Sequence, residues 1–242
     1  MLAFRLNLPD QNPLKTADSY HELGVTQCKT GEFAAALCSH ERALHIRLEH
    51  LGNRHQDTAS SYYELGISQW CMEKYECALD YHMKAQSIAL DALGELHRVT
   101  ADSYYERGKT YFCLEDYRTS LRLHIRAYNT RRELLGQEHP DTAKSNHELG
   151  VTLYAMEQYS SALPHLECAL TERQKIHGAL HEDVAQSYHQ LARTQYKMQD
   201  YTQAFQSYNS AVSIRKRLLE ENHSKTAEGY YGLGILSFSN QD

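Results

Sequence analysis

The stretch TADSYHELG at residues 16–24 decides the fold, because close variants of it return at a fixed interval along the chain. The variants are TASSYYELG at 58–66, TADSYYERG at 100–108, TAKSNHELG at 142–150, VAQSYHQLA at 184–192 and TAEGYYGLG at 226–234. Each begins 42 residues after the one before it, without insertion or deletion. Such a period indicates a solenoid, in which each structural unit packs only on its neighbours.

The repeated stretch itself predicts the first helix of each unit, here called helix A. In the first unit it is expected over residues 17–28, where one face gathers Ala17, Tyr20, Leu23 and Gly24. Thr residues at the starts and Asp residues just before them are expected to cap these helices, as in Thr58 and Asp57. A small residue recurs at one place in helix A, which predicts close approach by a second helix: Gly24, Gly66, Gly108, Gly150, Ala192 and Gly234.

A second helix, helix B, is expected over residues 32–51 of the first unit, because apolar residues from Phe33 to Ile46 recur on one side. It is expected to end at a glycine that recurs in the next three units: Gly52, Gly94, Gly136 and Gly178. The fold class expected is therefore all-α, a right-handed superhelical solenoid of antiparallel helix pairs.

The boundaries follow from the period. We expect a poorly ordered N-terminal extension at 1–15, then repeats at 16–57, 58–99, 100–141, 142–183 and 184–225, and at 226–242 the first helix of a sixth repeat or a closing helix.

The pattern of an aromatic residue, Leu-Gly, an aromatic opening helix B and two later alanines resembles the tetratricopeptide repeat. The usual unit has about 34 residues, and the longer unit here, with a tail such as LLGQEHPDTA at 134–143, resembles kinesin light chain and nephrocystin-type repeats. The resemblance implies peptide binding by helix A residues. Kinesin light chain carries Asn-Asn before the Leu of helix A, where this chain has pairs such as Tyr63-Glu64, so its cargo recognition is not carried over.

Read onto this sequence, the resemblance implies a peptide-binding concave face lined by the A helices. Its candidate residues are an aromatic or His position, an adjoining acid, a later aromatic stripe and two cations: His21, Glu22, Tyr63, Glu64, Trp70, Tyr105, Glu106, Lys109, Phe112, His147, Glu148, Tyr154, His189, Arg193 and Tyr196. Rigid aromatics with a polar handle are favoured at protein interfaces. The alternative interpretation is that the aromatics pack in the core and the glutamates form a solvated face.

Catalysis and cofactor binding are not expected. The chain has no Gly-rich phosphate loop or nucleophile elbow, and its acids, histidines and cysteines recur with the repeat instead of converging on one place. Five histidines repeat every 42 residues and are expected to bond backbone groups at the turns, not a metal: His55, His97, His139, His181 and His223.

Composition limits the partners. The net charge is −6 and no apolar run reaches the length of a membrane span, so neither nucleic-acid binding nor membrane insertion is expected. The six cysteines fit no disulfide or zinc framework, which favours a cytoplasmic protein.

The function expected is a scaffold or adaptor that binds a partner peptide or helix. The alternative is a passive structural arm of a larger signalling or transport protein. Apolar residues in the last helix, such as Leu233 and Phe238, predict self-association through the C-terminal edge.

Overall fold

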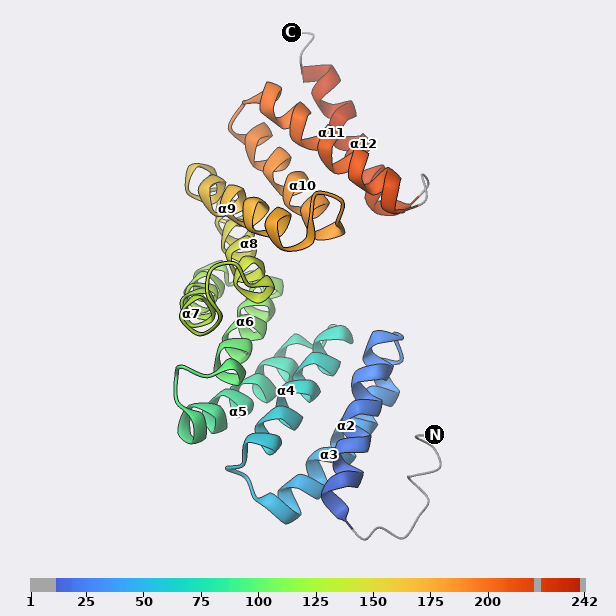
Figure 1. The fold of residues 1–242 in the computed structure, drawn as a ribbon, viewed down its shortest axis with the longest axis vertical. Helices are drawn as coiled ribbons and strands as arrows, with labels where there is room; N and C mark the ends of the chain where they lie inside the picture. The colour runs from blue at the N-terminus through green and yellow to red at the C-terminus, as the bar shows by residue number, and fades with distance from the viewer. Residues whose placement is uncertain (1–11, 220–222, 240–242) are drawn as a thin grey trace. The chain divides into compact units, whose positions relative to one another are not determined.

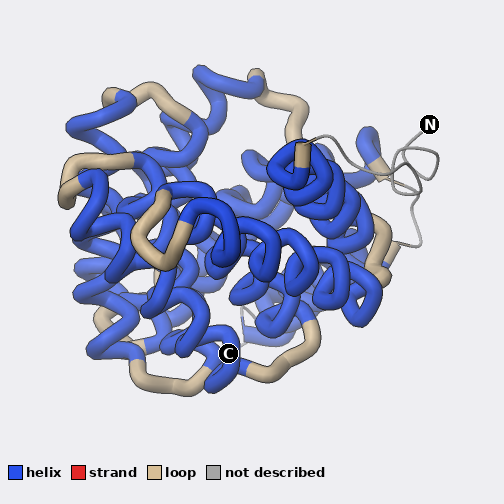
Figure 2. Tube along the Cα trace, turned by 90° about the horizontal axis from the view of Figure 1, so that it is seen from below, coloured by secondary structure: helices blue, strands red, loops and turns tan. Residues whose placement is uncertain are grey.

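The computed structural model describes residues 12–219 and 223–239, and in this part of the chain every regular element is an α-helix (Figures 1 and 2). Helix A of the successive repeats is α2 (Pro13–Lys29), α4 (Gln56–Cys71), α6 (Arg98–Cys113), α8 (Pro140–Ala155), α10 (Glu182–Lys197) and α12 (Ser224–Ser239). Helix B is α3 (Phe33–Leu51), α5 (Tyr75–Leu93), α7 (Tyr117–Leu135), α9 (Tyr159–His177) and α11 (Tyr201–Leu218). The predicted alternation of two helices per 42 residues is confirmed.

The A helices begin earlier than predicted. The first starts at Pro13 and takes in the last residues of the extension expected at 1–15, while residues 1–11 lie outside the described part. Proline suits the first turn of a helix, where its missing N–H is not needed, and Asn12 caps this turn by accepting a hydrogen bond from the Lys15 backbone.

The chain divides into two compact units, Met1–Thr130 (unit 1) and Arg131–Asp242 (unit 2), and each is described by itself. In unit 1, helices α2 to α6 pack in chain order, each against the next. In unit 2, α8 to α12 do the same. Neighbouring A helices also touch one another, α2 with α4, α4 with α6 and α8 with α10, so each unit presents a continuous face of A helices.

The small residues of helix A lie directly against a side chain of helix B, as predicted. A Cβ atom added at Gly66 would lie 2.4 Å from the His82 ring, and one added at Gly150 would lie 2.5 Å from Leu166. His82 is fully buried, and burial lowers its pKa to about 4. Gly234 differs, because nothing lies within 4 Å of the added Cβ.

From α4 onward the caps of the A helices are the recurring histidines, not the threonines and aspartates predicted from the sequence. In α4 the Nδ1 atom of His55 accepts a hydrogen bond from the Asp57 backbone N–H at 3.1 Å. The equivalent bonds at the other A helices come from His97, His139, His181 and His223. The neighbouring threonine has another role, since Thr58 donates to the carbonyl of Gly52 at 2.8 Å and so ties the turn together. The backbone-bonding role predicted for these histidines is confirmed.

A buried arginine of helix B joins successive repeats. Arg173, 4% exposed, donates to the carbonyl of Asp183 at 2.9 Å and to the hydroxyl of Ser187 at 2.8 Å. Arg47 and Arg131 make the equivalent pair of bonds, each to helix A of the repeat that follows it. In the second repeat this position is Ala89, so the junction between α5 and α6 is held differently.

Candidate functional site

A small cavity of about 190 Å³ opens on the A-helix face of unit 1. It gathers three of the predicted residues, His21 from α2 and Tyr63 and Glu64 from α4. Helix α6 adds Arg98 and Asp102, which form an ion pair at 3.7 Å across one helical turn. The cavity forms where the adjacent A helices α2, α4 and α6 lie in contact.

Glu64 carries a carboxyl group whose pKa departs strongly from its usual value. Burial, with the nearby charges of Glu106 and Glu22 as further causes, raises its pKa to about 7. Its carboxyl group therefore changes charge close to neutral pH. A carboxyl group of this kind can donate a hydrogen bond when protonated and can bind a cation when ionised.

A second group on the same face stacks a cation on an aromatic ring. The Nζ atom of Lys109 lies 2.9 Å from Oε2 of Glu106, one turn away on α6, and 4.0 Å from the ring centroid of Trp70 on α4. The Trp70 ring in turn lies 6.3 Å from that of Tyr75 at the start of α5. The cation is thus held between a carboxylate and an indole ring, which fixes its position.

Unit 2 repeats this arrangement with different residues. Arg193 of α10 donates to the side chain of Gln190 at 3.2 Å and lies 4.8 Å from the ring centroid of Tyr154 on α8. Tyr154 contacts Tyr159 at 5.4 Å between ring centroids. Gln190 is a neutral amide where unit 1 has the carboxylate of Glu106, so the positive charge of Arg193 is not balanced by this partner.

Two predicted contact residues lie in the core instead of on a binding face. Tyr105 is 1% exposed and packs its ring 5.7 Å from that of His124. His147 is 2% exposed, and burial holds its pKa well below the usual value. They occupy the position that faces helix B within each repeat, so the core-packing interpretation applies to them and they offer no surface to a ligand.

The other predicted residues divide between packing and surface. His189 packs on Tyr208 at 5.4 Å, and the rings of Phe112 and Tyr196 pack on the aromatic residue that opens their own helix B, all three remaining half-buried. Glu22 is exposed and Glu148 is half-buried. The aromatic stripe therefore serves packing at the hairpin turn and still presents an edge to solvent.

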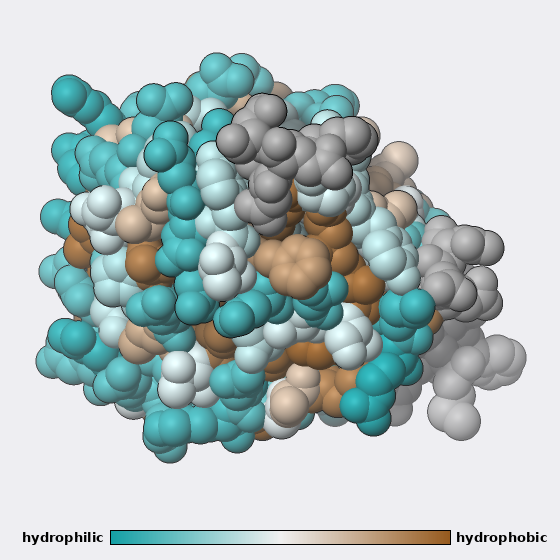
Figure 3. Space-filling view, turned by 90° about the horizontal axis from the view of Figure 1, so that it is seen from above, coloured by the Kyte–Doolittle hydropathy of each residue, from teal (hydrophilic) through white to brown (hydrophobic). Residues whose placement is uncertain are grey.

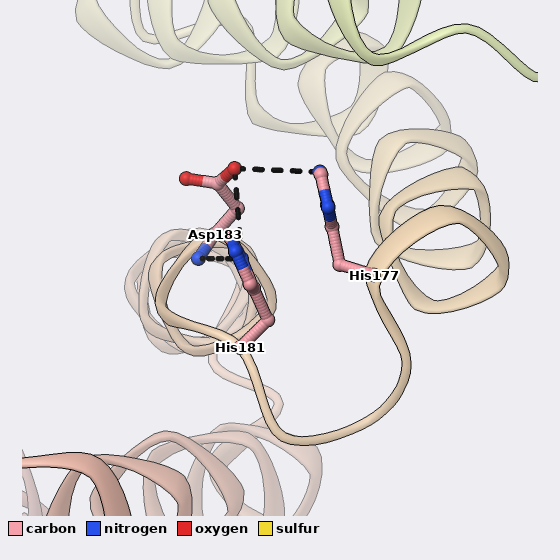
Figure 4. Close-up of side chains that lie close together, drawn as sticks. All are labelled: His177, His181 and Asp183. Carbon is pink, nitrogen blue, oxygen red and sulfur yellow. Dashed lines mark hydrogen bonds and ion pairs between the residues drawn. The ribbon is translucent and has the colours of Figure 1, made fainter.

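A cluster that the sequence analysis did not single out as a site lies between α9 and α10 (Figure 4). The Oδ2 atom of Asp183 lies 3.6 Å from Nε2 of His177 and 3.7 Å from Nδ1 of His181, and the two rings stack at 4.2 Å. These groups are of the kind that bind metals, but Nδ1 of His181 already accepts the capping bond from the Asp183 backbone N–H. A metal on this atom would break the cap, so the donor set does not fit a metal well.

The family assignment comes from comparison with known proteins. A model of the tetratricopeptide repeat matches residues 15–91, 99–175, 146–217 and 183–241. The chain belongs to the tetratricopeptide-repeat family. No curated protein sequence matches the chain. No helix in the described residues is both long enough and apolar enough to cross a membrane.

Solved tetratricopeptide-repeat and related structures share the fold at low sequence identity. The nearly identical repeats of a kinesin light chain-type protein from Podospora anserina have a TM-score of 0.72 and 21% identity, covering 87% of this chain and 100% of that chain. BtubC (BKLC) from P. vanneervenii has a TM-score of 0.78 and 20% identity, covering 90% and 87%. A Rap protein complexed with competence and sporulation factor has a TM-score of 0.72 and 14% identity, covering 99% and 69%. The resemblance to kinesin light chain-type repeats is confirmed for the fold.

The sequence pattern could not have placed Arg98 and Asp102 in the cavity. Arg98 is the first residue of α6, where the sequence predicted a turn, and Asp102 lies one turn later in the predicted helix A. The signal was the difference between Arg98 and its equivalents in the other repeats, which are Leu14, Gln56, Pro140, Glu182 and Ser224.

Proposed function

We propose that this protein is a non-catalytic interaction scaffold that binds an extended peptide or a helix of a partner protein on the A-helix faces of its units. The observation that carries the proposal is the cavity of unit 1, where His21, Tyr63 and Glu64 from two repeats meet. The lining combines charged and polar side chains with the ring of Tyr63 and the apolar side chain of Val99. A few placed polar groups give a ligand site its specificity.

Unit 1 favours a ligand with basic or hydroxyl-bearing side chains. Glu64 would accept a hydrogen bond from such a group, and a bound cation would lower its raised pKa and hold it ionised. In unit 2, Arg193 above Tyr154 favours an acidic or aromatic side chain. The fold supports this use, since the similar Rap structure is a complex with competence and sporulation factor.

We also propose a reducing compartment such as the cytoplasm as the place of action. All six cysteines are free, and none is paired in a disulfide.

The test is a peptide-display selection against the purified chain, repeated with Tyr63→Ser plus Glu64→Gln. Neither replacement should disrupt the core, because both side chains are only half-buried. Gln is also the natural residue at the equivalent position 190. We expect a shared motif containing Lys, Arg or a hydroxyl residue, with binding reduced about tenfold in the double variant, as for the loss of a charged hydrogen bond.

The matched control is Glu49→Gln, an exposed carboxyl group on α3 away from the cavity, which should select the same motif as the wild type. If no peptide is enriched, or if the cavity variant enriches the same peptides equally well, the proposal fails. The chain would then be better described as a structural arm.

A further inference from the structure

A cavity of about 510 Å³ lies among α5, α6 and α7 in unit 1, and it shares no lining residue with the cavity on the A-helix face. Three arginines line it, Arg107 from α6 and Arg122 and Arg126 from α7. Apolar side chains of α5 form its edge, with Met83 41% exposed and Leu90 36% exposed. Both are large apolar side chains left open to solvent, which is unusual beside so much positive charge.

Two of the arginines are held in place by neighbours. Arg126 lies over the Tyr104 ring at 5.4 Å and donates to its hydroxyl group at 3.2 Å. Arg107 donates from Nη1 to the side chain of buried Gln86, while its buried Nε atom has no hydrogen-bond partner. The guanidinium groups are therefore oriented before any ligand arrives.

The third arginine, Arg122, is exposed and makes no hydrogen bond or ion pair. Asp116 on the loop before α7 is an acidic group that interacts with it electrostatically. Glu95 accepts a bond from the Tyr104 hydroxyl at 3.5 Å. The two carboxylates, Asp116 and Glu95, are too few to balance the charge of three guanidinium groups.

The charge is a departure from the repeat and not a consequence of it. The residue equivalent to Arg107 is a leucine in every other repeat: Leu23, Leu65, Leu149, Leu191 and Leu233. The arginine of helix B that joins repeats elsewhere is replaced at this junction by Ala89. Arg107 thus takes no part in the bonding that the repeat arginines share, and its link is to Gln86 alone.

Unit 2 holds a related cavity whose lining includes one arginine, Arg217. It has a volume of about 430 Å³ and lies among α9, α10 and α11, with Tyr188 in the place of Tyr104. The residues equivalent to Arg107, Arg122 and Arg126 are Leu191, Gln206 and Ser210. Both units therefore have a cavity beside the equivalent tyrosine, and the cavity of unit 1 is lined by three arginines where that of unit 2 is lined by one.

We propose that the cavity lined by Arg107, Arg122 and Arg126 binds an anionic side chain of a partner protein, a carboxylate or a phosphorylated hydroxyl group flanked by aliphatic residues. Guanidinium groups bind both kinds of oxygen anion in forked geometry, and Met83 and Leu90 would cover the flanking residues. This second site is independent of the A-helix face, so either proposal can fail without the other.

The test uses pools of peptides that are degenerate around a fixed central residue, which is phosphoserine, glutamate or glutamine. We expect the full chain to capture the phosphoserine or the glutamate pool about tenfold more than the glutamine pool, with the excess decreasing as salt is added. Preference between the two anionic pools identifies the source of the anion. Equal capture of all three pools would overturn the proposal.

Paired variants locate the site. Arg122→Gln changes an exposed side chain to the residue of the equivalent position in unit 2 and should reduce anionic capture about tenfold. Arg118→Gln, an exposed arginine on the same helix outside the cavity, should leave it unchanged. Arg107→Leu restores the residue of the other repeats and should also reduce capture, with the melting temperature retained. If Arg118→Gln lowers capture as much as Arg122→Gln, the binding is non-specific and the site is wrong.

Discussion

The two units build the same cation–aromatic contact from different residues. In unit 1 Lys109 pairs with the carboxylate of Glu106 and lies over Trp70, whereas in unit 2 Arg193 pairs with the amide of Gln190 and lies over Tyr154. The position of each residue within the repeat is the same. The geometry is therefore a property of the repeat, and the charge is a property of the individual unit.

The two units also differ in the charge around their second cavities, those of about 510 Å³ in unit 1 and about 430 Å³ in unit 2. Unit 1 has three arginines where unit 2 has leucine, glutamine and serine. On the A-helix face, unit 1 thus pairs its cation with a carboxylate and unit 2 pairs its cation with a neutral amide, while the arginines at the three cavity positions occur in unit 1 alone. A repeat whose core fixes the backbone leaves the surface free to vary, and that variation is where binding specificity can arise.

The largest expected effect tests the shared core. Gly66→Ala in unit 1 and Gly150→Ala in unit 2 should each lower the free energy of unfolding by about 2–3 kcal/mol, because the new methyl group would overlap a buried side chain of helix B. Gly234→Ala is the control, since its Cβ meets nothing and alanine favours the helix. Urea unfolding followed by circular dichroism measures all three. Equal stability of the three variants would contradict the shared packing.

The second test concerns the buried arginine that joins repeats. Arg173→Ala should cost about 1–2 kcal/mol, because it leaves the carbonyl of Asp183 and the hydroxyl of Ser187 without their partner. Lys175→Ala on the same helix removes an ion pair with Glu138 that is exposed to solvent, and it should leave stability almost unchanged. Thermal unfolding compares them, and a small loss for Arg173→Ala would show that the junctions do not depend on this residue.

Much of this frame could be predicted from the sequence. The period fixed the helix pairs, and the glycines correctly predicted close contact with helix B. The caps were wrong because threonine and aspartate are common N-caps, whereas the capping atom here is an imidazole nitrogen two residues before Asp57. The burial of Tyr105 could not be read from the period, because residues at the same repeat position, such as Tyr63, remain half-buried.

A smaller effect separates the units by pH. The pKa of Glu64 is higher in the folded than in the unfolded chain, so the folded state binds more protons between about pH 4.5 and pH 7 and loses stability as pH rises through this window. The stability of Glu64→Gln relative to the wild type should therefore rise by about 1–2 kcal/mol as the pH is raised from about 5 to about 8. The stability of Glu49→Gln relative to the wild type should be the same at both pH values. A pH-independent effect of Glu64→Gln would count against a strained carboxylate in unit 1.

A further small effect tests the cation–aromatic contact. Lys109→Met and Arg193→Met should each lower the free energy of unfolding by about 0.5–1 kcal/mol, since both cations lie over a ring. Trp70 is the single tryptophan of the chain, so its fluorescence reports on unit 1. Lys109→Met should change this emission and Arg193→Met should not. A change in both would mean that the two contacts are not separate.

The smallest expected effect concerns the C-terminal edge. Figure 3 views the end of the molecule near α12 and shows hydrophobic residues gathered amid a hydrophilic surface. Tyr231 is 74% exposed and Tyr230 is 42% exposed on this helix. We propose weak self-association through this edge, which sedimentation at increasing concentration would detect and Tyr231→Ser would reduce. A monomer at every concentration would dismiss it.

The most direct test of peptide binding on the A-helix faces is photo-crosslinking with a selected peptide. A peptide enriched by display, carrying a photoreactive residue, would be irradiated with the full chain and the attached residues identified by mass spectrometry. The account predicts crosslinks to α2, α4 and α6, near Tyr63 and Glu64, that disappear when unlabelled peptide is added in excess. Crosslinks confined to the B helices, or no enriched peptide at all, would contradict it.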